Sequence, residues 1–422
     1  MHSVTNAIPT GTIASIPAKA HAHRALICAA LANSPSTILL SRTSKDIDAT
    51  MDSLRGLGAH VIYKNNIVTV TPGPVPAKGN VVPHESGTTL RLLLPVAASI
   101  CNDVDVDAKG RLPDRPLEPM LSEMKAHGVT FSQDKPPFTM TGRLQSGNFS
   151  MVGDVSSQFF SGLLLAAPQI GLSTITATTP LQSSDYVTLT TETMRDFGVE
   201  VEHTLPDTNI NEAFTVPFGA SFIGRDNYQI EGDWSNAAIW MVAAGMTGKP
   251  ITITGMNKNS VQADRRIMQV MIDAGCDVVW DGMNITVTGR ASKPIHADLE
   301  QMPDMLPVMA ALACSIQGES AFVKGARLRL KESDRLIAVA NLVRDLGGTV
   351  REEGDDLYSI GSGILKGGHG DCVNDHRLVM AGTLMALISE NSVTLKDSEA
   401  ITKSYPDFFE DWNLLGGDAH GI

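Results

Sequence analysis

A short stretch near residue 330 combines four cations, two carboxylates and a serine. It reads Arg327-Leu328-Arg329-Leu330-Lys331-Glu332-Ser333-Asp334-Arg335. The alternation of basic residues and leucines predicts a strand with one polar face, and Ser333 and Asp334 predict the start of an amphipathic helix. Because helix N-termini attract anions, the stretch indicates an anion site at a strand-to-helix junction. An exposed, ion-paired helix start is the alternative that these residues alone leave open.

Basic and helix-capping residues recur just before other apolar runs. They are Lys19 and Arg24, Glu85 to Thr89 with Arg91, Arg111 to Pro116, Ser156 to Gln158, Gln301 to Asp304, and Asn374 to Arg377. Helix N-termini with Arg and Lys suit phosphate and carboxylate groups. The sequence has no GxGxxG, Walker A, HExxH or GxSxG pattern. Asp304 and Glu332 remain as carboxylates among cations, a set that suits acid–base transfer between small anions without a cofactor.

Composition restricts the partners of the chain. Its 422 residues are 43% hydrophobic and 19% charged, with a formal charge of -13. Such a chain buries large cores, and its length predicts two or three domains. The negative field argues against nucleic acid and anionic membranes as partners. A local basic cluster must therefore hold any anionic ligand.

The cysteines and the N-terminus predict a cytoplasmic protein. Five cysteines are widely spread, mostly within apolar runs, so neither a disulfide framework nor a CxxC metal site is indicated. Leu26 to Ala32 after Lys19 and Arg24 superficially resembles a signal peptide, but the apolar core is short and its basic residues lie deep in the chain. No apolar run reaches the 18 or so residues of a membrane span.

One sequence pattern, an amphipathic helix followed by a glycine and a β-rich run, recurs six times. The predicted helices with their glycines are Met51 to Gly58, Met120 to Gly128, Thr191 to Gly198, Ile267 to Gly275, Leu336 to Gly347 and Phe408 to Gly416. The predicted strands after the first five are 59–62, 129–131, 199–201, 276–279 and 349–350. Glycine suits the left-handed residue that ends a helix. The spacing of roughly 70 residues indicates an internal repeat.

A second, more apolar helix lies between successive copies of this pattern. The predicted helices are Ala25 to Leu31, Leu90 to Ala98, Phe159 to Ala167, Ala237 to Ala244, Leu306 to Ala313 and Leu378 to Ile388. Because they are apolar nearly all round, we expect them to be buried. The repeat is therefore a β-α-β-α-β unit, and three units per domain predict two similar domains with a ligand cleft between them.

The chain resembles the enolpyruvyl transferase family of 3-phosphoshikimate 1-carboxyvinyltransferases, also called EPSP synthases, over essentially its whole length. The matching segments are Lys19 to Leu26, Ser86 to Thr88 with Arg91, Arg111 to Pro116, Val155 to Phe159, Pro303 to Asp304, Lys331 to Arg335, Asn374 to Arg377, and Lys403 to Phe408. The resemblance implies a two-domain inside-out α/β barrel. It also implies that 1–16 and 229–422 form one domain and 17–228 the other.

The implied reaction transfers the enolpyruvyl group of phosphoenolpyruvate to the 5-hydroxyl of shikimate 3-phosphate and releases phosphate. By resemblance, Asp304 is the base, Glu332 the acid, and Lys19 contacts both substrates. The implied shikimate 3-phosphate residues are Lys19, Ala20, Arg24, Ser156, Ser157, Gln158, Ser183, Asp304, Arg327 and Lys331. The implied phosphoenolpyruvate residues are Lys19, Gly87, Arg115, Gln158, Arg335, Arg377 and Lys403. The resemblance implies no metal, no cofactor and a monomer.

Two departures from the family pattern concern shikimate 3-phosphate. The usual Ser-Lys-Ser motif is Ala18-Lys19-Ala20, which predicts weaker binding of that substrate. Arg327 stands where asparagine is common, and either supplies a phosphate contact or is an exposed strand charge.

Two other functions stay open. One is enolpyruvyl transfer to UDP-N-acetylglucosamine, although Arg111 to Pro116 lacks the cysteine typical of that enzyme. The other is a non-catalytic ligand-binding descendant, which Ala18 and Ala20 motivate and which the retained Asp304 and Glu332 oppose.

Overall fold

The chain forms two compact units in a computed structural model that describes residues 1–208 and 211–422. The first unit comprises Met1–Ile16 and Glu231–Ile422, and the second comprises Pro17–Ile230. The chain thus leaves the first unit after Ile16 and returns to it at Glu231. The range expected from the sequence for the middle domain was 17–228.

Within the described residues, each unit holds three four-stranded sheets. The strand orders are β14-β3-β5-β4, β6-β7-β9-β8 and β10-β11-β13-β12 in the second unit, and β16-β17-β15-β2, β18-β19-β21-β20 and β22-β23-β1-β24 in the first. In every sheet one edge pair is parallel and the other two pairs are antiparallel. The predicted α/β class with six copies of one unit is confirmed, and the structure adds a fourth strand to each copy.

The second unit contains the following elements. Its strands are β3 (Ser36–Leu39), β4 (His60–Lys64), β5 (Ile67–Thr71), β6 (Gly79–Val81), β7 (Asp103–Val106), β8 (Thr130–Phe131), β9 (Phe138–Thr141), β10 (Asn148–Met151), β11 (Ser173–Ala177), β12 (Glu202–Thr204), β13 (Glu212–Val216) and β14 (Tyr228–Gln229). Its helices are α1 (Lys19–Ala30), α2 (Lys45–Gly56), α3 (Gly87–Ile100), α4 (Met120–Ala126), α5 (Ser157–Ile170) and α6 (Asp185–Asp196).

The first unit repeats this arrangement. Its strands are β1 (His2–Val4), β2 (Gly11–Ala14), β15 (Ile251–Thr254), β16 (Asp277–Asp281), β17 (Asn284–Thr288), β18 (His296–Asp298), β19 (Gly318–Val323), β20 (Thr349–Glu353), β21 (Asp356–Gly361), β22 (Gly368–Asp371), β23 (Val393–Lys396) and β24 (Ala419–Gly421). Its helices are α7 (Trp234–Thr247), α8 (Ile267–Asp273), α9 (Leu306–Ser315), α10 (Arg335–Asp345), α11 (His376–Ala386) and α12 (Phe408–Leu414).

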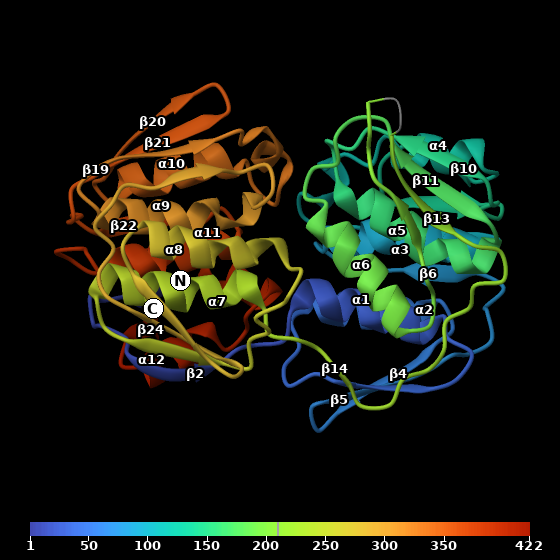
Figure 1. Ribbon diagram of the computed structural model, residues 1–422, viewed down its shortest axis with the longest axis horizontal. Helices are drawn as coiled ribbons and strands as arrows, with labels where there is room; N and C mark the ends of the chain where they lie inside the picture. The colour runs from blue at the N-terminus through green and yellow to red at the C-terminus, as the bar shows by residue number, and fades with distance from the viewer. Residues whose placement is uncertain (209–210) are drawn as a thin grey trace. The chain divides into compact units, whose positions relative to one another are not determined.

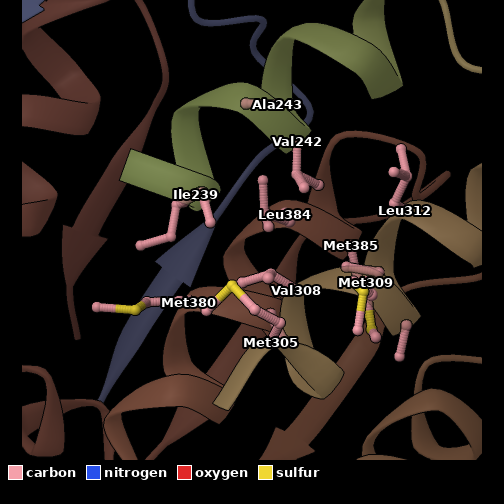
Figure 2. Close-up of a cluster of buried hydrophobic side chains, with 14 of the residues drawn as sticks. Ile239, Val242, Ala243, Met305, Val308, Met309, Leu312, Met380, Leu384 and Met385 are labelled. Carbon is pink, nitrogen blue, oxygen red and sulfur yellow. The ribbon is translucent and has the colours of Figure 1, made fainter. Parts of the chain in front are cut away.

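The more apolar helix of each copy is buried, as predicted. In the first unit α7, α9 and α11 contact one another and form the centre of the core (Figure 1). Figure 2 shows Ile239 and Val242 of α7 facing Val308 of α9 and Leu384 of α11. In the second unit α1, α3 and α5 occupy the same positions in the repeat, and α3 packs along α5.

The glycines after the amphipathic helices have the predicted left-handed conformation. Their φ angles are 104° at Gly58, 96° at Gly128, 89° at Gly198, 100° at Gly275, 89° at Gly347 and 93° at Gly416. Each helix therefore ends where the sequence indicated.

The predicted strand at 327–331 is wrong. Ala326–Leu330 forms a 3-10 helix, because Leu328 N donates to Gly325 O at 2.9 Å and Arg329 Nη2 donates to the Gly354 carbonyl at 2.6 Å. Leu328 is buried but Leu330 is 42% exposed, so the leucines do not share a buried face. The predicted helix start is confirmed: α10 follows Asp334, whose carboxylate accepts from Ile337 N at 3.3 Å.

The predicted strand at 199–201 is also misplaced, since β12 begins at Glu202. Val199 N donates to Met194 O at 2.9 Å and so belongs to the closure of α6. Over the described residues, no helix combines the length and apolar character needed to cross a membrane.

Candidate active site

Arg335 gathers three carboxylates in the first unit. Its side chain is 2% exposed at the start of α10. Nε donates to Asp375 Oδ2 at 2.8 Å, Nη1 to Asp304 Oδ1 at 2.6 Å, and Nη2 to Glu332 Oε2 at 2.7 Å. The two carboxylates predicted to act as base and acid are therefore held by one guanidinium, in the charge-assisted bonds that fix geometry best.

Nearby cations keep the carboxylate of Asp304 ionised. It lies in the 3-10 turn Pro303–Met305 before α9, and its Oδ1 also accepts from Lys331 Nζ at 3.0 Å. Burial opposes ionisation, but Lys331 and Arg335 outweigh it and hold the pKa of Asp304 well below its ordinary value. Burial lowers the pKa of Lys331, although Asp304 opposes that shift. An anion that drew these cations away would make Asp304 a stronger base.

Asp375 organises this cluster and was not among the predicted site residues. It is fully buried at the N-cap of α11, where Oδ1 accepts from Arg377 N at 3.0 Å. Its Oδ2 accepts from Ser333 Oγ at 3.0 Å as well as from Arg335. The signal that could have found it is its cap position in Asn374 to Arg377, directly before an apolar helix.

Arg377 and Lys403 supply two more buried cations. They are 4% and 8% exposed. Arg377 Nη1 donates to the Ser235 carbonyl at 3.0 Å, and Lys403 Nζ donates to the Asn374 carbonyl at 2.7 Å. Asn374 and Val373 have φ angles of 55° and 42°. Left-handed backbone is costly for a β-branched residue, so the turn whose Asn374 carbonyl accepts from Lys403 is strained.

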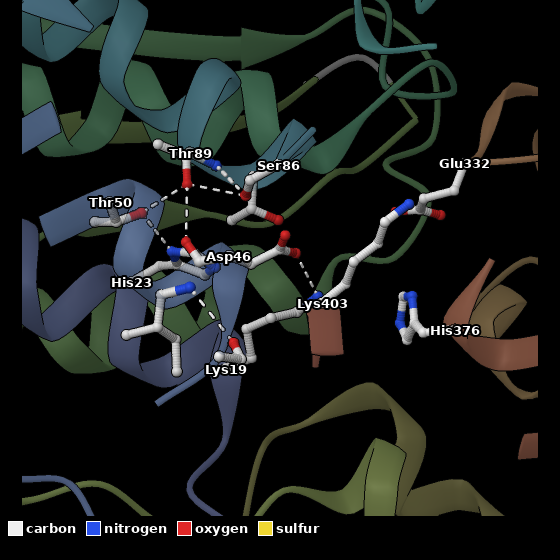
Figure 3. A network of polar contacts seen from close by, with 12 residues as sticks. Lys19, His23, Asp46, Thr50, Ser86, Thr89, Glu332, His376 and Lys403 are labelled. Carbon is white, nitrogen blue, oxygen red and sulfur yellow. Dashed lines mark hydrogen bonds and ion pairs between the residues drawn. The ribbon is translucent and has the colours of Figure 1, made fainter. Parts of the chain in front are cut away.

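In the second unit, Lys19 pairs with an acidic partner that the sequence analysis did not name. Lys19 is the first residue of α1, and its Nζ lies 2.7 Å from Asp46 Oδ2 of α2 (Figure 3). The N-cap residue Ala18 gives no side-chain hydrogen bond to α1. The fixed ion pair places the lysine at the helix N-terminus, where an anion would also be attracted.

A buried polar chain lies behind this ion pair (Figure 3). His23 Nδ1 lies 2.7 Å from Thr50 Oγ1, which lies 2.7 Å from Thr89 Oγ1. Thr89 Oγ1 donates toward Ser86 Oγ at 2.9 Å, and Ser86 caps α3 by accepting from Thr89 N at 3.2 Å. Burial, followed by Lys19 and Arg24, keeps the pKa of His23 well below its ordinary value, so the imidazole is neutral. The chain links α1, α2 and α3.

Gly87 and Arg115, which the resemblance assigns to phosphoenolpyruvate, are in contact. A Cβ on Gly87 would lie 2.5 Å from Arg115 Nη1, so only glycine admits the guanidinium there. Gln158 bridges α5 to α3: its Nε2 donates to Thr88 Oγ1 at 2.8 Å, and its Oε1 accepts from Arg91 Nη1 at 3.1 Å. These residues form one polar cluster at the N-termini of α3 and α5.

The three predicted serines, Ser156, Ser157 and Ser183, are also buried. Ser156 is the N-cap of α5 and accepts from Gln158 N at 3.3 Å, and Ser157 is the first residue of the helix. Ser183 is 2% exposed with a φ angle of 53°, a strained conformation for serine. Ser156 is thus a helix cap, and its hydroxyl proton remains to be donated.

Arg24 is buried and directed into the protein. Its Nε donates to Thr190 Oγ1 at 2.7 Å, Nη1 to the Ala20 carbonyl at 2.7 Å, and Nη2 to the Tyr186 carbonyl at 3.0 Å. Burial lowers the pKa of Arg24 to about 10. These bonds join α1 to α6 and orient Ala20, the second residue of α1.

The structure thus groups the predicted residues by unit. The first unit brings together Asp304, Lys331, Glu332, Arg335, Arg377 and Lys403, with Arg327 close enough to lower the pKa of Lys331. The second unit carries Lys19, Ala20, Arg24, Gly87, Arg115, Ser156, Ser157, Gln158 and Ser183.

Comparisons with known proteins agree on one family. The family model for EPSP synthase (3-phosphoshikimate 1-carboxyvinyltransferase) matches residues 7–412. The chain is 36% identical over 413 residues to the 3-phosphoshikimate 1-carboxyvinyltransferase of Clostridium kluyveri, covering 97% of this chain and 95% of that protein. It is 35% identical over 418 residues to that of Methanocorpusculum labreanum, covering 97% of both.

Solved structures agree at the level of the fold. The structure of EPSP synthase from Acinetobacter baumannii matches with a TM-score of 0.80 and 22% identity, covering 100% of this chain and 99% of that one. This likeness shows the fold, in agreement with the two-domain inside-out α/β barrel expected from the sequence.

Proposed function

The chain belongs to the EPSP synthase family and transfers the enolpyruvyl group of phosphoenolpyruvate to shikimate 3-phosphate, and we propose how its residues divide this work. Asp304 accepts the proton of the 5-hydroxyl as that oxygen bonds to C2 of phosphoenolpyruvate. Glu332 gives a proton to the methylene carbon. When phosphate leaves, its bridging oxygen takes the proton that Asp304 accepted, and Glu332 takes a proton back from the methyl carbon, so that the enol ether forms and both carboxyl groups are regenerated.

We propose that the remaining cations hold the two substrates. Arg115, Arg335, Arg377 and Lys403, with Gly87 and Gln158, bind phosphoenolpyruvate. Arg24, Ser156, Ser157, Ser183, Arg327 and Lys331, with Ala20 and Gln158, bind shikimate 3-phosphate, and Lys19 contacts both. Bringing two polyanions together requires local positive charge, which these groups supply in a chain of net charge -13.

The observation that carries the proposal is the guanidinium of Arg335 between Asp304 and Glu332. Nη1 lies 2.6 Å from the proposed base and Nη2 lies 2.7 Å from the proposed acid. One fixed cation thus sets the separation of two carboxylates that must act on neighbouring atoms of the reacting substrates. A role in binding alone would give no reason for holding two carboxylates beside an anion site.

Phosphate release from phosphoenolpyruvate tests the proposal. We expect release with shikimate 3-phosphate, none with UDP-N-acetylglucosamine, and none without an acceptor. Asp304→Asn and Glu332→Gln should each lower kcat by at least about 100-fold, the usual range for a lost acid or base. Asp298→Asn, at a carboxylate paired with Lys324 and 46% exposed in the same unit, is the control and should keep full activity.

The alternatives predict different results. Release only with UDP-N-acetylglucosamine would support enolpyruvyl transfer to that acceptor. Saturable binding of shikimate 3-phosphate without turnover would support a non-catalytic ligand-binding descendant. We further propose a cytoplasmic monomer, in keeping with five buried cysteines. Sedimentation equilibrium at micromolar concentration tests the oligomeric state.

A further inference from the structure

Arg377 is held far less firmly than Arg335. The guanidinium of Arg335 has four hydrogen bonds to carboxylate oxygens. The guanidinium of Arg377 has one bond within the described residues, to the Ser235 carbonyl at 3.0 Å. Its Nε is buried and has no hydrogen-bond partner among those residues. The pose of Arg377 therefore depends on Ser235.

Ser235 is in turn held by a buried carboxylate outside the proposed chemistry. Its Oγ donates to Asp264 Oδ2, from the first turn of α7 to the 3-10 turn Ala263–Arg266. Asp264 is 1% exposed, and its Oδ1 has no hydrogen-bond partner within 1–208 and 211–422. Burying a carboxylate with an unpaired oxygen costs free energy. The hydrogen bond from Ser235 Oγ to the other oxygen of Asp264 is the interaction that offsets this cost.

Asp264 lies within the electrostatic reach of the proposed site. Burial, then the charge of Asp304, raises its pKa to about 6, while Arg377 opposes the shift and Asp233, the N-cap of α7, adds to it. Asp264 is therefore repelled by the charge of Asp304 and attracted by the guanidinium of Arg377.

We propose that Asp264 is a positioning residue: through Ser235 it fixes the guanidinium of Arg377 in the pose that receives the anionic group of phosphoenolpyruvate. This inference rests on the proposed assignment of Arg377 to that substrate. The carboxylate oxygen of Asp264 accepts the hydrogen bond from Ser235. The negative charge of the same carboxylate weakens the binding of an anion at Arg377. The two contributions make opposite predictions, because loss of negative charge near Arg377 strengthens anion binding whereas loss of position weakens it.

Steady-state kinetics with both substrates separate these contributions. Asp264→Ala removes the acceptor, and we expect KM for phosphoenolpyruvate to rise about three- to tenfold, the size of one hydrogen bond, with KM for shikimate 3-phosphate unchanged. Asp264→Asn keeps an oxygen for Ser235 Oγ and should hold KM for phosphoenolpyruvate at or below the wild-type value. Ser235→Ala, which keeps the charge of Asp264, should raise KM for phosphoenolpyruvate at least as much as Asp264→Ala, and the double variant should be no worse than Ser235→Ala.

Three results would overturn the inference. They are an unchanged KM for phosphoenolpyruvate in Asp264→Ala, equal rises of both KM values, and additive losses in the double variant. Ser315→Ala removes a buried hydroxyl that bonds the Leu312 carbonyl at the other end of α9, and serves as the structural control. Arg377→Ala tests the substrate assignment separately from the role of Asp264. If it leaves KM for phosphoenolpyruvate unchanged, the substrate assignment fails and the inference with it, whereas a raised KM there beside a normal Asp264→Ala overturns the inference alone.

Discussion

Ala20 stands where the family resemblance places a serine that contacts the shikimate phosphate. It is the second residue of α1, beside Lys19, and its carbonyl accepts from Arg24 at 2.7 Å, so its position is fixed. Ala20→Ser should lower KM for shikimate 3-phosphate about two- to tenfold, because one hydrogen bond to the phosphate is gained. Initial-rate kinetics measure this change, with Ala126→Ser on the exposed face of α4 as control. An unchanged KM would mean that no phosphate oxygen lies near position 20.

Gly87 tests the phosphoenolpyruvate site through Arg115. An alanine Cβ would lie 2.5 Å from Nη1 and 3.0 Å from Cζ of that guanidinium. Because the obstructing atoms end a flexible side chain, the fold should tolerate Gly87→Ala while Arg115 moves. We expect KM for phosphoenolpyruvate to rise about tenfold, as for one charge-assisted bond lost, at unchanged thermal stability. Gly421→Ala, whose Cβ would meet no atom within 4 Å, is the control. A loss of stability without a change in KM would contradict the assignment.

Asp264 also predicts a pH dependence of stability. Its pKa is raised to about 6 in the folded chain, mainly by burial. Between about pH 4 and 6 the folded state thus binds more protons than the unfolded state, so the free energy of unfolding falls as pH rises through this window. Asp264→Asn removes the penalty and should stabilise the chain by about 1 to 3 kcal/mol at pH 7.5, but little at pH 4. Urea unfolding at both pH values measures this, and a gain independent of pH would refute it.

The sequence identified most charged residues of the site but not the carboxylates Asp46, Asp264 and Asp375. Asp304, Glu332 and Arg335 stand out because they lie in motifs rich in cations, and the structure brings them together. Asp46 and Asp375 were missed because each reads as an ordinary residue at a helix start, and Asp264 because nothing local marks it. Their roles depend on contacts between separate helices, which spacing along the chain does not encode.

At the level of elements, periodicity found all of the buried helices and most strands. It predicted β8, Thr130–Phe131, but missed the fourth strand of that copy, β9, Phe138–Thr141, which pairs antiparallel with β8. It misread Arg327 to Lys331 because alternating side chains suit both a strand and a short 3-10 helix with one leucine exposed. There the hydrogen bonds of Arg329 to Asp355 and to the Gly354 carbonyl favour the 3-10 helix.

The glycines that end the amphipathic helices predict a graded series of stabilities. Gly416 has a φ angle of 93°, and its added Cβ would meet only Ile8 O, at 3.7 Å. Gly58 has a φ angle of 104°, and its Cβ would lie 2.3 Å from Pro74 O. Gly416→Ala should therefore cost about 1 to 2 kcal/mol from backbone strain, and Gly58→Ala should cost more because a carbonyl must also move. Equilibrium urea unfolding compares them, and equal losses would show that strain alone decides the cost.

For the whole molecule, the two units have separate cores. Buried residues of Pro17–Ile230 form one cluster, and those of the other unit form a second. The three sheets of the second unit use strands from residues 36 to 229 only, since β14 returns to pair with β3 in parallel. A fragment of residues 17–230 thus contains every strand that its sheets require.

We therefore expect residues 17–230 to fold alone and to unfold cooperatively. The matched fragment 17–226 lacks β14 and with it Tyr228, whose hydroxyl lies 2.8 Å from both His21 Nε2 and Asp196 Oδ2 and whose ring packs on Phe197. Deleting β14 leaves β3 with an unpaired edge and removes the hydrogen bonds of Tyr228 to α1 and α6. The shorter fragment should have a lower urea midpoint, or none. Near-ultraviolet circular dichroism measures both, and equal midpoints would mean that β14 does not complete the unit. A fragment 17–230 without a cooperative transition would mean instead that its core depends on the rest of the chain.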